Sequence, residues 1–337
     1  MTQENKKQTG AKKAAGGNKV IFIIIGIILI AAAVIFSTQK VIQVQQGSNA
    51  MTEGKALMQQ GKYDDAAKKF REYNTIDPNN EEGYVLLSRA LMAGDHKDEA
   101  YYFLEKGLKK FPKNMKMKQE MGNFYVSMGQ NEKAKPILAE VLKENPKNAI
   151  AQTLMGMIYV DEQIPDKAYE CFKTVTTIPP TSDKETSDAV TVSYKALLEI
   201  IGNTGKDGND EMAIVDQAIE KLPEANKPRA YVAKGIILFK KGDMDKALEN
   251  FKTALEKDPA GEAWANYPIA AIYEKKGDKE KAVQYYKEFL KVFGDPKNLT
   301  ESNLIKASIY KGIEMNELPA NIPAVQKKIE DLGGTAE

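Results

Sequence analysis

The chain has little of the chemistry on which catalytic and metal-binding sites depend. Its 337 residues include one cysteine, Cys171, and one histidine, His96. A single cysteine cannot form an intramolecular disulfide, and this pair supplies neither a nucleophile with its base nor a zinc site. A phosphate-binding loop is missing too, because the glycines from Gly202 to Gly208 follow no strand pattern. The sequence therefore predicts a protein that is not an enzyme and that needs no cofactor and no metal.

Excess charge of one sign is also missing. The chain has 48 basic and 47 acidic residues, which gives a formal net charge of +1. Most acidic side chains stand among lysines on polar helix faces, where water solvates them. Because no overall basic excess marks an electrostatic footprint for nucleic acid, we expect neither nucleic acid nor a small-molecule substrate as a ligand.

Long hydrophobic runs are scarce as well, with one exception near the N-terminus. Residues 20–36 (VIFIIIGIILIAAAVIF) contain no charge and no hydrogen-bonding side chain. As a helix this run is about 26 Å long, at the short end of what crosses a bilayer. The sequence predicts a disordered basic tail at 1–19 and a transmembrane signal anchor at 20–38.

The charges that flank this run predict its orientation. Residues 1–19 carry five lysines and one glutamate, whereas Lys40 is the only charged residue between Phe36 and Glu53. The positive-inside rule then places the N-terminus in the cytoplasm and the rest of the chain on the other side of the membrane.

Cleavage of the run by a signal peptidase is the alternative interpretation. Ala31–Ala33 are small residues of the kind that the peptidase accepts. However, Val34–Phe36 continue the run beyond them, and the run is longer than a usual signal core. No cysteine follows it closely, which excludes a lipoprotein. We therefore favour an uncleaved anchor.

A strict 34-residue repeat organises the sequence that follows. Five series of residues recur at this spacing over four units and stay in register with one another. The series are Pro78, Pro112, Pro146 and Pro180; Ala66, Ala100, Ala134 and Ala168; Gly54, Ser88, Gly122 and Gly156; Leu57, Leu91, Tyr125 and Tyr159; and Phe70, Leu104, Leu138 and Phe172.

Each unit has the pattern of two packed helices. Apolar residues recur at helical spacing, and a glycine turn such as that at Gly61 divides the unit. The small residue of the first helix, as at Gly54 or Gly156, lets the second helix pack closely through its alanine, and a proline then ends the unit. Because one unit cannot bury its apolar face alone, neighbouring units must stack.

This period and residue pattern resemble the tetratricopeptide repeat (TPR) family. The resemblance implies an all-α protein, a right-handed TPR superhelical solenoid of about seven helix-turn-helix repeats, preceded by one N-terminal transmembrane helix. The divisions that we expect are TPR repeats 1–4 at 47–182, a degenerate repeat 5 at 183–227, repeats 6–7 at 228–296 and C-terminal capping helices at 297–337.

Repeat 5 and the C-terminal segment depart from the regular pattern. The step from Ala168 to Ala247 is longer than two repeat periods, so repeat 5 carries an insertion. Its polar stretches 181–188 and 204–210 surround two apolar-periodic segments, Val190–Ile201 and Met212–Leu222, which still predict a helix pair. In the C-terminal segment we expect two capping helices, at Thr300–Met315 and Asn321–Leu332.

In TPR arrays the first helices of the repeats line a concave groove, and the resemblance implies that a protein or peptide binds there. Much of the predicted lining is apolar, and flexible methionines suit a surface that accepts varied apolar segments. The alternative is that neighbouring first helices bury some of these side chains against one another. The predicted groove residues are Met51, Lys55, Met58, Val85, Leu86, Arg89, Met92, Asn123, Val126, Leu154 and Met157.

A narrower family function does not fit the residues. Co-chaperone TPR domains hold a C-terminal carboxylate with lysines, asparagines and an arginine on three consecutive first helices. The matching positions here hold Met51 and Lys55, then Leu86, then Lys116 and Glu120. An acid and two apolar residues stand where the clamp needs donors. This also weakens the resemblance to mitochondrial outer-membrane import receptors.

The sequence as a whole looks like the membrane-anchored TPR proteins of the bacterial envelope. The resemblance implies a single-pass membrane scaffold that binds protein partners and assists assembly, secretion or chaperoning. Its TPR domain would be extracytoplasmic, on the periplasmic side of the inner membrane if the source is bacterial. The alternative is a cytosol-facing receptor or assembly factor on an organelle membrane.

Overall fold

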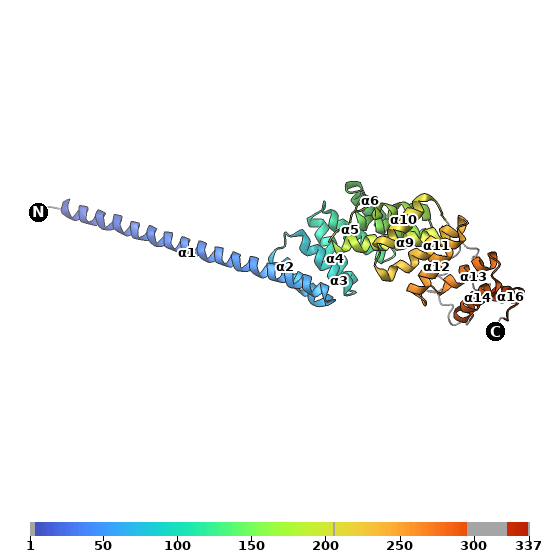
Figure 1. Ribbon diagram of the computed structural model, residues 1–337. Coiled ribbons are helices and arrows are strands. Elements are labelled where there is room, and N and C mark those ends of the chain that lie inside the picture. Colours follow the sequence, from blue (N-terminus) through green and yellow to red (C-terminus); the bar gives the residue numbers. More distant parts are fainter. Residues whose placement is uncertain (1–3, 205, 295–321, 336–337) are drawn as a thin grey trace. The chain divides into compact units, whose positions relative to one another are not determined.

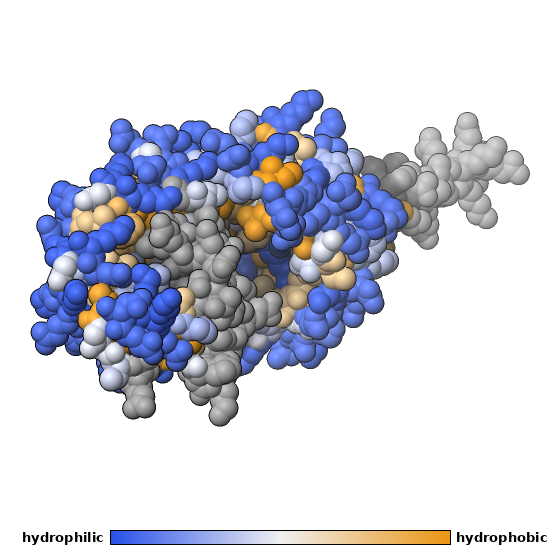
Figure 2. Space-filling model, turned by 90° about the vertical axis from the view of Figure 1, so that its right-hand side faces the viewer, coloured by the Kyte–Doolittle hydropathy of each residue, from blue (hydrophilic) through white to orange (hydrophobic). Residues whose placement is uncertain are grey.

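The computed structural model describes residues 4–204, 206–294 and 322–335. Within these ranges the chain is helical and contains no strand, which confirms the all-α prediction (Figure 1). The chain forms two compact units, Met1–Met128 and Gly129–Glu337. On the face that Figure 2 shows, the coloured side chains are mostly hydrophilic and the hydrophobic ones occupy small areas.

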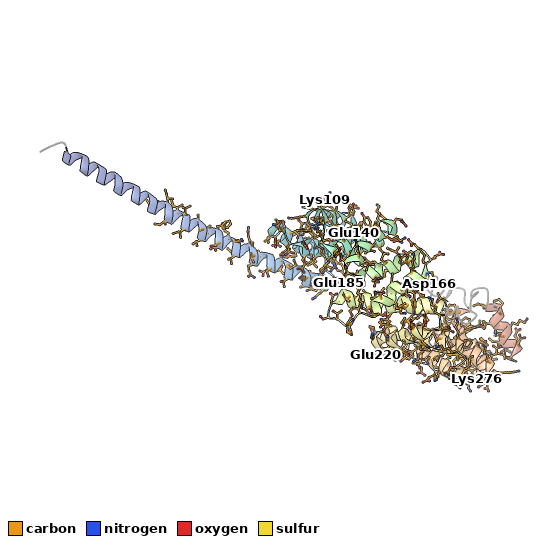
Figure 3. All side chains as sticks on the ribbon, turned by 90° about the horizontal axis from the view of Figure 1, so that it is seen from above. Lys109, Glu140, Asp166, Glu185, Glu220 and Lys276 are labelled. Carbon is orange, nitrogen blue, oxygen red and sulfur yellow. The ribbon has the colours of Figure 1, made fainter. Side chains whose placement is uncertain are left out.

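The first unit begins with one long helix, α1 (Glu4–Gln59). Its 56 residues correspond to a length of about 84 Å. The helix includes residues 4–19, where the sequence predicted a disordered tail; the alanines and lysines of this stretch are good helix formers, which favours its continuation. Large apolar residues from Ile24 to Val44 are exposed along this helix, and the side chains drawn on it stand out from the ribbon (Figure 3).

The remaining helices follow as pairs. In the first unit they are α2 (Tyr63–Ile76), α3 (Glu81–Ala93), α4 (Lys97–Lys110) and α5 (Met115–Ser127). In the second unit they are α6 (Asn131–Glu144), α7 (Ala149–Asp161), α8 (Pro165–Thr176), α9 (Lys184–Thr204), α10 (Asn209–Lys221), α11 (Lys227–Lys240), α12 (Met244–Lys257), α13 (Asn266–Lys275), α14 (Lys279–Phe293) and α16 (Ile322–Asp331), with short 3-10 turns at Glu224–Asn226 and Ala263–Ala265.

The repeat period extends to the residues that begin the first helices. Asn80, Asn114 and Asn148 are the N-caps of α3, α5 and α7, and each side chain accepts a hydrogen bond from a backbone N–H of the first turn. Each asparagine stands two residues after a proline of the 34-residue series. The proline thus ends one pair, and the asparagine satisfies the free N–H groups of the next.

The turns inside the pairs also repeat. Gly61, Asp95, Gly129 and Gln163 follow one another at the repeat period, and all four have a positive φ between 60° and 72°. Glycine adopts this left-handed region without strain, whereas a side chain there costs free energy. Asp95 and Gln163 therefore hold a turn geometry that their own residue types disfavour.

Close approach of the two helices in a pair depends on glycine. A methyl group at Gly54, Gly156 or Gly235 would lie 2.6–2.7 Å from a ring carbon of a phenylalanine on the second helix of the same pair. The sequence predicted close packing at this glycine through the alanine of the second helix; in the structure an aromatic ring covers the glycine, and the alanines are buried as well. The rings belong to Phe70, Phe172 and Phe251.

The insertion in repeat 5 lengthens one helix. α3, α5 and α7 have 13 residues each, whereas α9 has 21. α7 ends at Asp161, and the position one repeat period later is Lys195, so residues 196–204 extend α9 beyond the regular frame. α9 and α10 cover the two apolar segments of repeat 5.

The C-terminal helix α16 closes the second unit. Val325 and Ile329 are buried in the same apolar core as α13 and α14. Glu274 on α13 accepts hydrogen bonds from Tyr286 Oη (2.7 Å) and Lys328 Nζ (3.0 Å). Desolvation alone raises the pKa of Glu274, but these bonds outweigh it and lower the pKa. α16 lies where the second capping helix was expected, and the first, at Thr300–Met315, falls outside the described residues.

We predict that Gly235→Ala destabilises the protein by about 1–3 kcal/mol, because the added methyl group overpacks the contact with the Phe251 ring. The same change should cost less stability in a Phe251→Leu background. The second repeat supports this expectation, because it combines the larger residue Ser88 at the glycine position with Leu104 at the phenylalanine position. Chemical denaturation of the four proteins in this double-mutant cycle gives the coupling. Equal costs in both backgrounds would contradict the glycine–ring contact.

Candidate functional site between α7, α8 and α9

The predicted groove residues of the first unit lie on α1, α3 and α5, but many are partly covered. Val85 is 1% exposed and belongs to a core cluster. Met51, Met58, Leu86 and Met92 are half-buried and pack against the cluster around Ala66 and Leu91. Asn123 is exposed and Val126 half-buried. At Val85, helix packing therefore accounts for the apolar side chain.

Ion pairs connect the first helices of this unit. Lys55 Nζ on α1 lies 2.8 Å from Glu82 Oε1 on α3. Arg89 on α3 pairs with Glu120 on α5, and both side chains are largely buried. These charged groups bridge adjacent helices, so the two predicted cationic groove residues already have carboxylate partners.

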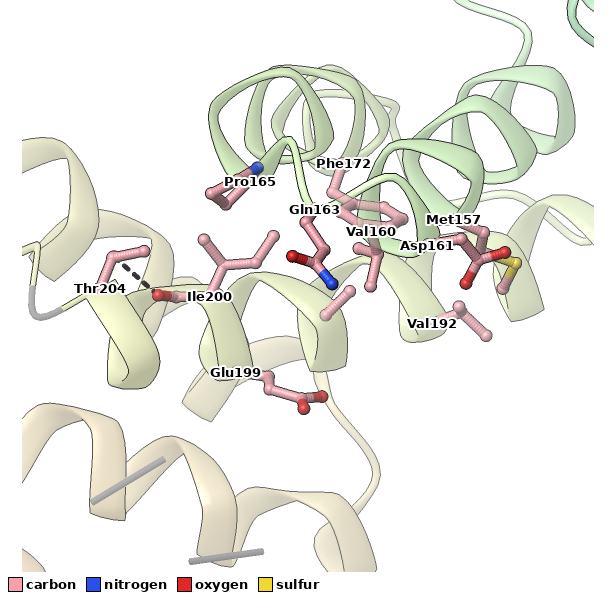
Figure 4. Close-up of a pocket in the computed structure, with 11 residues that line it drawn as sticks. Met157, Val160, Asp161, Gln163, Pro165, Phe172, Val192, Glu199, Ile200 and Thr204 are labelled. Atoms are coloured by element: carbon pink, nitrogen blue, oxygen red, sulfur yellow. Dashed lines mark hydrogen bonds between the residues drawn. The ribbon is translucent and has the colours of Figure 1, made fainter. Parts of the chain in front are cut away.

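In the second unit the predicted residues lead to a pocket. Leu154 is 6% exposed and is part of the core, whereas Met157, one turn further along α7, is 36% exposed. Met157 lies at the edge of a cavity of about 300 Å³ between α7, the α7–α8 turn, α8 and α9 (Figure 4). The cavity is lined by Met157, Val160, Asp161, Gln163, Pro165, Phe172, Val192, Ala196, Glu199, Ile200 and Thr204.

The extension of α9 builds one wall of this pocket. Four lining residues, Ala196, Glu199, Ile200 and Thr204, fall in the segment that continues α9 beyond the 34-residue frame. Leu197, Leu198 and Ile201 are fully buried in the core of the second unit and hold this segment in place. In Figure 4, Ile200 and Gln163 point into the gap between α9 and the α7–α8 turn.

The pocket combines apolar walls with an acidic rim. Val160 is 49% exposed, so an apolar side chain faces solvent beside the cavity. Asp161 accepts a hydrogen bond from Asn131 Nδ2 (3.2 Å), and Glu199 has no ion pair among the described residues. Neither lysine nor arginine lines the pocket. This arrangement suits an apolar side chain that has a positive charge next to it.

The residues near this site do not favour covalent catalysis. Cys171 precedes the pocket residue Phe172, but burial raises the pKa of its thiol to about 11. A thiol with that pKa is almost entirely protonated at neutral pH and is a poor nucleophile. The polar groups inside the pocket are neutral: Gln163, and Thr204, whose hydroxyl donates to the carbonyl of Ile200 (2.7 Å).

Sequence reasoning missed the α9 side of the pocket. It treated 204–210 as a polar loop and named no residue of repeat 5 among the predicted groove residues. The available signal was the apolar pattern Val190–Ile201, which continues past Lys195, where the regular frame predicts the end of the helix. The remaining groove residues stay a prediction.

We predict that Gln163→Gly raises the free energy of unfolding by about 1 kcal/mol, because glycine adopts the observed φ of 60° without a Cβ clash. Asp95→Gly is the matched control: its φ is 62°, and aspartate tolerates this region better than glutamine does. Asp95→Gly should therefore gain less stability than Gln163→Gly does. Urea denaturation at constant m-value measures both. A loss of stability in Gln163→Gly would show that the glutamine side chain supports the pocket wall.

Comparison with known proteins identifies the repeats. Tetratricopeptide repeat profiles match residues 57–114, 98–158, 228–260 and 265–295. A TPR repeat-containing protein of Methanocaldococcus jannaschii is 23% identical over 271 residues, which is 75% of this chain and 46% of that protein. The photosystem I assembly protein Ycf3 of Cyanophora paradoxa is 35% identical over 82 residues, which is 23% of this chain and 47% of Ycf3. The chain thus spans less than half the length of these two relatives.

Solved structures show similar helix pairs. The structure of YrrB, a TPR protein with an unusual peptide-binding site, covers 58% of this chain with 94% of its own at 19% identity and a TM-score of 0.48. The helix pairs, their 34-residue period and the matching profiles agree. The chain belongs to the tetratricopeptide repeat family, whose fold is a scaffold for protein interaction.

Proposed function

We propose that this protein is a membrane-anchored scaffold that binds protein partners at the cell envelope, with its repeats on the extracytoplasmic side. The observation that carries the proposal is the exposed apolar surface of α1. By length and composition, α1 is the one helix of the described residues that could cross a membrane. In water, each such isoleucine or phenylalanine left exposed forgoes about 1.5–3 kcal/mol of burial free energy.

A cleaved signal sequence has a similar composition, so the anchor needs a second argument. Beyond the polar residues Ser37–Lys40, Val41, Ile42 and Val44 are also exposed along the same unbroken helix. The helix then enters the first repeat, where Gly47 contacts Tyr73 and Ile76 on α2. Since one helix joins the apolar run to the repeat core, retention of the run fits this architecture better than its removal.

The acidic-rimmed pocket supports a protein ligand. A volume of about 300 Å³ accommodates one or two side chains rather than a folded domain, so a short segment of the partner would enter it. Asp161 and Glu199 favour a lysine or arginine beside the inserted apolar residue. The similarity to an assembly protein over 82 residues supports a role in assembling a larger complex. A cytosol-facing receptor on an organelle membrane is the competing function.

We predict that a reporter active only outside the cytoplasm is active when it is fused after residue 337. The reason is the lysine asymmetry around the apolar run. The same reporter inserted after residue 19 should be inactive, which provides the control. Activity only from a cytoplasmic reporter at residue 337 would contradict the orientation and favour the receptor alternative.

We predict that Met157→Glu combined with Val160→Glu weakens partner binding at least tenfold, because two more carboxylates would face the acidic rim and the apolar ligand. Both side chains are well exposed, so thermal unfolding should change little. Peptides selected from a random library on the detergent-solubilised full chain provide the ligand, and titration measures its affinity. Met128→Glu is the matched control, since Met128 is 40% exposed and lies outside the pocket. Equal losses of affinity in the double variant and in Met128→Glu would contradict the assignment of ligand binding to this pocket.

A further inference from the structure

A second pocket lies in the first unit, on the side of the second helices. It has a volume of about 770 Å³ and is lined mainly from α2 and α4, with Pro78 from the α2–α3 loop and Tyr84 from α3. Arg71, Lys106, Lys109 and Lys110 all contribute to its wall, and no carboxylate does. The chain is almost neutral as a whole, so this concentration of four cations is a local feature that selects an anionic ligand.

Two of these cations have no carboxylate partner. Arg71 pairs with Glu99, and Lys109 Nζ lies 3.4 Å from Glu105 Oε2. Lys110 Nζ instead donates to the backbone carbonyl of Pro78 (2.6 Å), and Lys106 lies over aromatic rings at 5.8 and 5.9 Å. Within the described part of the chain, the charges of Lys106 and Lys110 are therefore not neutralised.

A buried amide adds an unsatisfied donor to the same pocket. Asn74 lines the pocket, and both its Nδ2 and its Oδ1 are buried without a hydrogen-bond partner. Buried polar atoms in folded proteins nearly always have a partner. An anion with several acceptor oxygens, such as a phosphate, would accept from Asn74 Nδ2 and from the two lysines together.

The pocket lies at the end of the unit from which α1 departs. α2 runs antiparallel to α1, since Gly54 contacts Phe70 near the middle of α2 whereas Gly47 contacts Ile76 at its end. Asn74 and Pro78 stand at that same end, and the bond from Lys110 to the Pro78 carbonyl places the end of α4 beside them. The pocket with its cations therefore lies toward the end of the unit from which α1 continues to the apolar run.

The helix geometry brings this end close to a bilayer surface. From Phe36 to Gly47 the helix rises by about 16 Å. Val41, Ile42 and Val44, which are 68%, 50% and 65% exposed, follow the polar residues Ser37–Lys40 and bring apolar side chains to within three residues of Gly47. That leaves about 5 Å of helix, comparable with the headgroup layer of about 5–7 Å on each side of the hydrocarbon.

We propose that this pocket binds the phosphate group of an anionic lipid in the leaflet that faces the repeats, and so holds the first repeats on the bilayer. The proposal rests on the membrane anchor proposed above. An acidic protein segment matches the same charges. The lipid is favoured because the cations lie at the end of the unit that α1 leaves toward the apolar run, and because apolar side chains recur along α1 as far as Val44.

Energy transfer in nanodiscs tests this proposal on the full chain. With Cys171→Ser and Lys113→Cys, a donor dye is placed three residues after Lys110, and an acceptor dye is attached to lipid headgroups. Transfer should be higher in discs with one-third phosphatidylglycerol than in neutral discs, and high salt should remove the increase. Lys106→Gln with Lys110→Gln should lower the ratio of docked to undocked molecules by about 30-fold.

Matched variants distinguish an effect of this pocket from a general effect of positive charge on the protein. Lys68→Gln with Lys97→Gln removes two lysines from the opposite ends of the same helices and should leave the increase intact. Lys106→Arg with Lys110→Arg keeps the charge and should retain the increase as well. A response that survives Lys106→Gln with Lys110→Gln, or one that the control pair also loses, overturns the pocket.

Two further outcomes show whether the proposed anchor or the proposed lipid site is wrong. If the full chain does not incorporate into discs of either composition, the anchor is wrong, and the proposed function fails with it. If it incorporates but shows no dependence on anionic lipid, this inference alone is overturned. Binding of a polyglutamate peptide in neutral discs, lost in Lys106→Gln with Lys110→Gln and accompanied by no lipid response, would assign the pocket to an acidic protein instead.

Discussion

In three of the described helix pairs, α1–α2, α7–α8 and α11–α12, the contact between a glycine on the first helix and an aromatic ring on the second sets how the two helices approach. A ring carbon of Phe70, Phe172 or Phe251 occupies space that a side chain at the facing glycine would need. The two helices can therefore approach only at this point and in one register. A pair whose two helices approach in one fixed way presents a defined surface, and the first helix of the following pair stacks on that surface.

That constraint explains how repeat 5 accommodates extra residues. α9 begins close to its regular position, and Thr153 Oγ1 on α7 lies 3.0 Å from Ser193 Oγ on α9, which fixes the register before the extension starts. The additional residues then lengthen the C-terminal end of α9, where no repeat contact is displaced. Leu197 and Ile201 still enter the core, while Ile200 faces the new pocket. The array gains a pocket without loss of its frame.

Much of the fold could be predicted from the sequence because the repeat constraints are local. The spacing of proline, glycine and alanine located the pairs, and the run 20–36 located the exposed helix. The candidate site was harder, since periodicity gives the face of a residue but not what covers it. Val85 and Leu154 share a face with Met157, yet neighbouring side chains bury the first two. The wall of the pocket on α9 depends on where an insertion is placed, which the helical period alone does not specify.

The net charge of the chain also gave no indication of the two charged pockets. A formal charge of +1 excludes a uniform basic surface, but charges interact in salt solution over only about 8 Å, so local sets act independently of the total. The pocket on α9 presents Asp161 and Glu199, and the pocket on α2 and α4 presents Lys106 and Lys110. An anionic headgroup is repelled by the first pair and attracted by the second, whereas a basic segment of a partner experiences the reverse. Under the two proposals made above, opposite local charges would direct lipid and partner to different pockets.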